Sequence, residues 1–161
     1  MAMQILEATS LTDIKTVPRL FAEYAACLPI SLYFQGVDAE LAGLPGKYAP
    51  PGGTILLART DEQPAGCVAV RPLEPAGVCE MKRLYVRPEY RKLRLGRALA
   101  QAATAWAEAA GYRAMRLDTL PSMTTAIALY QSLGFADIAP YCANPHAGAR
   151  FLELILNHVL R

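Results

Sequence analysis

Basic residues crowd the start of one expected helix, in the stretch "RPEYRKLRLGRAL" that runs from Arg87 to Leu99. The basic side chains of its turn are Arg91, Lys92, Arg94 and Arg97. The first turn of a helix exposes unpaired N–H groups and a partial positive charge, so it attracts phosphate. Gly96 has no Cβ and lets the backbone approach a ligand closely. Cations at this end oppose the helix dipole, so a cluster of them needs a compensating anion. The stretch therefore predicts a phosphate site, with a solvated basic turn as the alternative.

Two further side chains could move protons. Tyr130 follows the apolar face of a later expected helix, where it is either a core tyrosine or a proton donor. Glu80 stands inside an apolar, strand-like run, where a carboxylate is either a base or half of an ion pair. Its candidate ion-pair partners are Lys82, Arg83 and Arg116.

The elements that must position these residues follow from hydrophobic periodicity and turn signals. The expected order is strand, two helices, three strands in an antiparallel meander, helix, strand, helix and two strands. This order predicts an α/β fold with a mixed sheet and helices on both faces. The expected strands span residues 3–9, 53–60, 65–74, 78–86 and 112–120, with two more in the tail. The expected helices are one that begins near Thr16 with Pro18 in its first turn, and three at 36–44, 95–111 and 121–134.

Composition limits the class of protein. A chain of 161 residues, 53% of them hydrophobic and 19% charged, is expected to form one domain over 1–161. The net charge of +2 gives no electrostatic footprint for nucleic acid. The four cysteines lack metal-ligand spacing and indicate a reduced, cytoplasmic protein without a metal site. No stretch approaches the roughly 20 apolar residues of a membrane span, so no membrane partner is expected.

The chain resembles the GNAT superfamily of N-acetyltransferases over nearly its whole length. "LYVRPEYRKLRLGRAL" is similar to the strand, loop and helix with which that family binds acetyl-CoA. The family pattern there is Arg or Gln, two residues, Gly, one residue, then Gly or Ala. Arg91 and Gly96 match it, whereas Arg94 stands at the first glycine. "TAIALYQSLGF" resembles the family's late helix, with a tyrosine before a Gly-Phe turn.

The resemblance implies a mainly antiparallel sheet of about seven strands and a set of cofactor contacts. Main-chain groups at Leu84, Tyr85 and Val86 would bind the pantetheine arm, on a strand that splays from its neighbour. The phosphates would lie on the turn formed by Arg91, Lys92, Leu93, Arg94, Leu95, Gly96 and Arg97. Thr119 would be a weaker cofactor contact. Tyr130 would be the general acid for the leaving thiolate and would also contact the cofactor, and Glu80 the base, acting through water.

Arg94 raises a question about the backbone of the turn. If the family's first glycine supplies a positive φ, an arginine there costs about 1–2 kcal/mol. If that glycine supplies only clearance, Arg94 can point outward and offer its guanidinium to the phosphates. We expect the second arrangement.

The expected reaction is transfer of an acetyl group from acetyl-CoA to a primary amine of a small molecule or peptide. A non-catalytic acyl-CoA-sensing module of the same fold is the alternative. The residues expected around the acceptor are Phe34, Gln35, Lys47, Tyr48, Tyr141, Asn144 and His146, and His146 is also a second candidate base. A homodimer is expected by resemblance, with the apolar stretch 149–156 as its expected interface.

Overall fold

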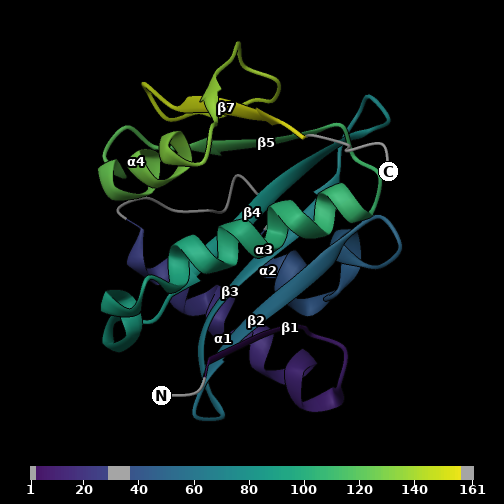
Figure 1. The fold of residues 1–161 in the computed structure, drawn as a ribbon, viewed down its shortest axis with the longest axis vertical. Helices are drawn as coiled ribbons and strands as arrows, with labels where there is room; N and C mark the ends of the chain where they lie inside the picture. The colour runs from purple at the N-terminus through teal and green to yellow at the C-terminus, as the bar shows by residue number, and fades with distance from the viewer. Residues whose placement is uncertain (1–2, 29–36, 157–161) are drawn as a thin grey trace.

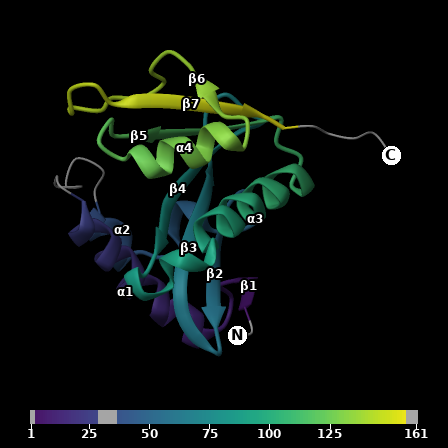
Figure 2. The same ribbon diagram turned by 60° about the vertical axis from the view of Figure 1, so that its left-hand side comes forward.

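One twisted sheet of seven strands carries the site in this computed structural model, which describes residues 3–28 and 37–156. The strand order is β1-β2-β3-β4-β5-β7-β6, and all pairs are antiparallel except β4 with β5. Helices cover both faces, α1 and α2 on one and α3 and α4 on the other (Figures 1 and 2). The expected fold class is confirmed.

The expected order of strands and helices also holds, and two short 3-10 segments are added to it. The strands are β1 Met3–Glu7, β2 Thr54–Thr60, β3 Gln63–Pro72, β4 Val78–Val86, β5 Ala114–Thr119, β6 Ala136–Asp137 and β7 Arg150–Ile155. The helices are α1 Leu11–Cys27, α2 Val37–Ala42, α3 Leu95–Ala109 and α4 Thr124–Ser132. The 3-10 segments are Gly46–Tyr48 and Pro88–Leu93.

Helix α1 begins earlier than its sequence predicts. Ser10 caps it through a hydrogen bond of 3.1 Å from the Asp13 N–H, so Pro18 lies inside the helix and not in its first turn. The ring of Pro18 removes one backbone hydrogen bond. Because the neighbours Val17 and Leu20 are fully buried, packing holds the helix together across that gap.

The sheet divides the core into two clusters. On one face, Leu99 of α3 and Tyr130 of α4 pack with Met115 of β5 and Leu152 of β7. Side chains of α1 pack on the other face with Tyr48 and Tyr85. The apolar runs of β2, β3 and β4 serve both clusters, because successive residues of a strand point to opposite faces.

The last helix and the last strands complete the sheet and its cover. Helix α4 begins at Thr124, after Pro121 and Ser122, and no side chain caps it. Strand β7 lies between β5 and β6, so both of its edges already pair within the chain. Over the described residues no helix has both the length and the apolar character to span a bilayer.

Candidate active site

Strands β4 and β5 separate in the middle of the sheet. They pair only where Val78–Glu80 faces Ala114–Arg116, although β4 continues to Val86 and β5 to Thr119. Figure 1 shows β5 and β7 turning away from β4 beyond that point. Within the described chain, the β5-facing edge of β4 beyond Glu80 therefore has no strand partner. Buried backbone groups rarely stay unpaired, so this edge is suited to bind a ligand.

A bulge in β4 shapes the same stretch. Cys67 pairs with Tyr85 and Ala69 with Lys82, which leaves an extra residue on β4 between them. Arg83 lies in that bulge with a φ of +60°. Its guanidinium is buried and donates to the Glu40 carboxylate of α2, from Nε at 2.9 Å and from Nη2 at 3.1 Å. A bulge re-aims a strand locally, and here an ion pair to a helix holds it.

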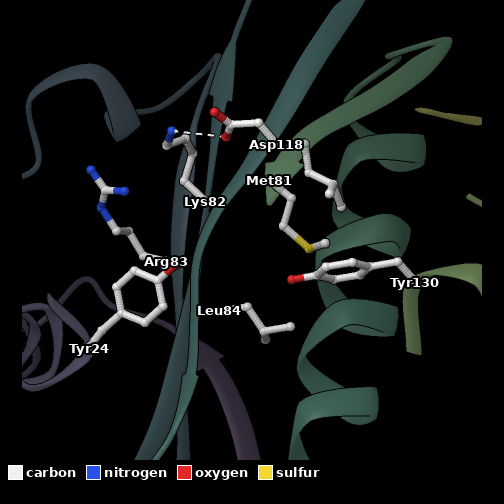
Figure 3. A pocket seen from close by; sticks show the side chains of 8 residues that line it. Tyr24, Met81, Lys82, Arg83, Leu84, Asp118 and Tyr130 are labelled. Atoms are coloured by element: carbon white, nitrogen blue, oxygen red, sulfur yellow. Dashed lines mark ion pairs between the residues drawn. The ribbon is translucent and has the colours of Figure 1, made fainter. Parts of the chain in front are cut away.

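Tyr130 faces the opening between the two strands. It lines a cavity of about 40 Å³ together with Tyr24, Met81, Lys82, Arg83, Leu84, Leu117 and Asp118. Figure 3 shows the Tyr130 hydroxyl pointing toward β4, between Met81 and Leu84. Burial, with smaller effects from Tyr24 and Asp118, raises the pKa of Tyr130 well above its ordinary value of 10.0. The phenol therefore keeps its proton at neutral pH and can act as a donor.

The cations of the basic turn form no ion pair with a carboxylate of the described residues. None of the ion pairs between described residues includes Arg91, Lys92, Arg94 or Arg97. Arg91 Nε donates to the Val86 carbonyl at 3.0 Å, and Arg97 Nη1 donates to the Ser132 hydroxyl at 2.8 Å. Both arginines thus keep other nitrogens for an external anion. Leu95 is fully buried under the turn, so only its backbone is available to a ligand.

The expectation for the Arg94 backbone is wrong. Arg94 has φ +59° and ψ +27°, so the position does require the left-handed region that favours glycine. Arg94 is the residue between the 3-10 segment and α3, where the chain must turn sharply. The side chain is exposed nonetheless, and it remains a cation at the start of α3. The turn keeps the glycine-type conformation and adds a charge.

The space around Gly96 would accommodate a Cβ. A Cβ built there would meet Leu129 Cδ2 at 3.8 Å and Val86 Cγ2 at 3.9 Å, both ordinary contacts. Packing within the protein therefore does not explain a glycine at this position. The absence of a Cβ leaves space beside the first N–H groups of α3, where a phosphate would approach.

Glu80 is almost fully buried and both of its oxygens have partners. Oε1 accepts from Arg71 Nε at 2.9 Å and lies 3.9 Å from Lys82 Nζ, and Oε2 accepts from the Tyr141 hydroxyl at 2.6 Å. Of the three expected ion-pair partners, only Lys82 lies close. Arg83 pairs with Glu40 and Arg116 with Glu153.

A second, larger cleft adjoins the small cavity. It has a volume of about 460 Å³ and is lined by Lys47, Arg71, Leu73, Glu74, Glu80, Lys82, Asp118, Tyr141, Cys142 and Ala143. Lys82 and Asp118 line both spaces and lie 3.7 Å apart, as the dashed line in Figure 3 marks. The two spaces therefore adjoin at this ion pair. We call the larger one the acceptor cleft, because two of the residues expected around the acceptor, Lys47 and Tyr141, line it.

The described residues among those expected around the acceptor divide into three groups. Tyr141 and Lys47 line the acceptor cleft. Asn144 lies behind it, where Nδ2 donates to Asp118 at 3.2 Å and Oδ1 accepts from the His146 backbone N–H at 3.0 Å. Neither Asn144 nor His146 lines the cleft itself.

Tyr48 lies away from the acceptor cleft. It is 1% exposed in the core beside α1 and donates to Glu40 at 2.8 Å. Phe34 and Gln35 fall outside the described residues.

The residues expected as cofactor contacts on strands lie on β4 and β5. Leu84 lines the cavity, whereas the Tyr85 ring faces α1 and leaves only its main chain for a ligand. Thr119 is a buried residue at the end of β5. Sequence reasoning missed Tyr24, Arg71 and Glu40, because each looks like an ordinary core or surface residue until folding brings it to the site.

Comparisons with known proteins agree with this geometry. Residues 17–135 match the Acetyltransferase (GNAT) family. An uncharacterized N-acetyltransferase of Schizosaccharomyces pombe is 44% identical over 143 residues, which cover 88% of each chain. Another from Dictyostelium discoideum is 30% identical over 97% of this chain and 100% of that one.

Solved structures share the fold. An acetyltransferase of the GNAT family from Staphylococcus aureus has a TM-score of 0.77 at 19% identity, over 97% of this chain and 100% of that chain. The yncA protein of Salmonella typhimurium, solved with its cofactor acetyl-CoA, has a TM-score of 0.75 at 18% identity, over 100% and 98%. With its fold, its family match and its curated relatives in agreement, the chain belongs to the GNAT family and is an N-acetyltransferase whose cofactor is acetyl-CoA.

Proposed function

We propose that this enzyme acetylates a primary amine of a small molecule or peptide by direct attack of that amine on the thioester. The observation that carries the proposal is the edge of β4 beyond Glu80, which has no strand partner among the described residues and borders the cavity of Tyr130. Bound acetyl-CoA supplies an activated acetyl group as a thioester. The protein must then bind it, orient the amine and move protons.

Each part of the donor site has a task. The basic turn and the start of α3 bind the phosphates through Arg91, Arg97 and the backbone at Gly96. The main chain of Leu84, Tyr85 and Val86 pairs with the amides of the pantetheine arm. A main-chain N–H of this edge also polarises the thioester carbonyl, a form of stabilisation that needs no side chain.

Proton movement completes the reaction. An ammonium acceptor loses one proton through water to Glu80 and on to solvent, because the neutral amine is the nucleophile. Its nitrogen bonds to the acetyl carbon as the carbon–sulfur bond breaks. The thiol of coenzyme A takes a proton from Tyr130, and the second proton that the nitrogen loses restores the phenol. Overall an ammonium and a thioester become an amide, a thiol and one free proton.

The substitution Tyr130→Phe tests the general acid. We expect turnover with an accepted amine to fall roughly 10²–10⁴-fold. Acetyl-CoA affinity should change little, because the ring stays and no hydrogen bond to a described residue is lost. Tyr112→Phe is the matched control, since that hydroxyl donates to the Gly52 carbonyl away from the cavity. Steady-state kinetics and calorimetric titration would check both variants. Equal losses of turnover and affinity in Tyr130→Phe would remove the general-acid role.

A further inference from the structure

The acceptor cleft presents a guanidinium whose outer nitrogens are unused. Arg71 is held by a single donor, Nε, at 2.9 Å from Glu80 Oε1, and its side chain is 29% exposed. Within the described part of the chain, neither Nη1 nor Nη2 of Arg71 has a hydrogen-bond partner. These two nitrogens form the planar pair that binds a carboxylate through two parallel hydrogen bonds.

Two lysines converge on the same space. Lys47 and Lys82 both line the cleft with Arg71. Burial lowers the pKa of Lys47, Glu40 beside it opposes this effect, and the positive charges of Arg71 and Lys82 lower the pKa further. The three cations are therefore close enough to repel one another. A carboxylate bound among them would relieve that repulsion.

Carboxylates line the cleft among these cations. Asp118, on β5, lies at the junction with the Tyr130 cavity, with one oxygen near Lys82 and the other bonded to Asn144. Glu80, on β4, also lines the cleft and is the partner of Arg71. These carboxylates attract a protonated amine to the place where the thioester must be attacked. The cleft thus offers both signs of charge, which suits a zwitterion better than a plain amine.

The strand register gives the distance from Arg71 to the junction with the Tyr130 cavity, which Lys82 and Asp118 mark. Arg71 pairs with Glu80, and Lys82 pairs with Ala69. Arg71 and Lys82 are therefore two residues apart along the ladder, or roughly 6–7 Å. That span suits a small molecule whose amine and carboxylate are a few bonds apart. Leu73, Tyr141 and Ala143 leave an apolar wall for its remaining atoms.

From this arrangement we propose that the acceptor is an amino acid or a close analogue, and that Arg71 binds its carboxylate. The inference rests on the proposed function, because it places the amine in front of the acetyl-CoA site. The chemistry is the acetyl transfer already balanced above.

The test compares each standard amino acid with its C-terminal amide as acceptor, by release of free coenzyme A and by mass spectrometry of the product. At least one amino acid should be acetylated with a kcat/KM about tenfold or more above that of its amide. Arg71→Gln should lower that kcat/KM by at least about tenfold, mainly through KM, and bring the ratio toward one. Arg71→Lys should keep part of the preference, because a charge remains.

Arg59→Gln is the matched control. Arg59 also pairs with a carboxylate at a similar exposure, 2.6 Å from Asp13, but it lies on β2 outside the cleft. This variant should keep the wild-type preference. Acetylation of amides or simple amines as well as of amino acids, or of no amino acid at all, would overturn the proposal. Calorimetric titration with acetyl-CoA separates failure of the proposed function from failure of this inference. Loss of acetyl-CoA binding would contradict the proposed function. Intact binding together with turnover of amides would contradict only the role of Arg71.

Discussion

Two groups of cations lie in different parts of this enzyme, one at the start of α3 and one around the acceptor cleft, and they are held in opposite ways. The four of the basic turn have no carboxylate partner among the described residues, and three of them are exposed. Those in and behind the acceptor cleft are each paired, Lys47 and Arg83 with Glu40, and Arg71 and Lys82 with Glu80. In the proposed function the first group binds a highly charged ligand, and the second faces an acceptor of low net charge.

The difference follows from what each group must do. Phosphates bring several negative charges, so a turn that leaves its own cations unpaired gains most when the ligand binds. A buried cation without a partner would be costly, so the cleft builds its charge from ion pairs. We therefore expect changes in the cleft network to affect folding, and changes in the turn to affect binding.

The largest effect on stability should come from Glu40→Gln. This carboxylate is buried, accepts from the buried Arg83 and Tyr48, and lies 3.3 Å from the partly exposed Lys47. Removing one partner of a buried pair costs about 3–5 kcal/mol in the free energy of unfolding. Chemical denaturation would measure it. Glu89→Gln, an exposed glutamate in the 3-10 segment before the turn, should stay within about 0.5 kcal/mol. Equal losses of unfolding free energy in Glu40→Gln and Glu89→Gln would contradict the structural role of the cleft ion pairs.

The same carboxylate gives a dependence on pH. Burial opposes its ionisation, but Arg83, Tyr48 and Lys47 together outweigh burial and hold the pKa of Glu40 below its ordinary value of 4.5. A lowered pKa in the folded state adds stability above about pH 4.5, and this stability is lost as the pH falls through the folded value. The unfolding free energy of the wild type should therefore decline more steeply in acid than that of Glu40→Gln. Parallel curves would contradict this.

In the basic turn, Arg91→Ala combined with Arg97→Ala should weaken acetyl-CoA binding by at least about tenfold. Stability should change by no more than about 0.5 kcal/mol for each substitution, because neither arginine has an ion-pair partner among the described residues. The difference in affinity from wild type should shrink at high salt, where exposed charges are screened. Calorimetric titration at two salt concentrations checks this. Unchanged affinity would show that the phosphates do not bind at this turn.

Gly96→Ala should change the free energy of unfolding least, and it should raise it where the other substitutions lower it. Alanine is favoured over glycine in a helix by up to about 1 kcal/mol, and the added methyl meets only ordinary contacts. Acetyl-CoA affinity should nevertheless fall, because the methyl fills the approach of the phosphate. Thermal unfolding and titration of one sample would show both effects. A more stable variant with unchanged affinity would mean that the phosphates bind elsewhere.

The same contrast explains what the sequence could predict. The basic turn is one continuous segment, so its composition and its place before a helix indicated a phosphate site directly. The splay of β4 from β5 and the position of Tyr130 came through the resemblance to a family. The acceptor cleft is assembled from five segments, with Lys47, Arg71, Glu80, Asp118 and Tyr141 on different strands, turns or loops. No local pattern links such residues.

Two errors have local physical causes. Pro18 was weighted as a helix breaker, although the Ser10 cap and the buried face of α1 outweigh one lost hydrogen bond. Arg94 was expected to avoid a positive φ, although the sharp turn into α3 imposes it. In both places the surrounding structure overrides the preference of a single residue.

The proposed cofactor site is tested most directly by isothermal titration of the protein with acetyl-CoA, desulfo-coenzyme A and ATP at low and high salt. We expect both coenzyme A ligands to bind, ATP to bind much more weakly, and binding to weaken as salt rises. The reason is that the turn supplies charge while the open edge of β4 recognises the pantetheine arm. Equal binding of ATP and acetyl-CoA would contradict the role of that edge, and no binding of acetyl-CoA would contradict the site itself.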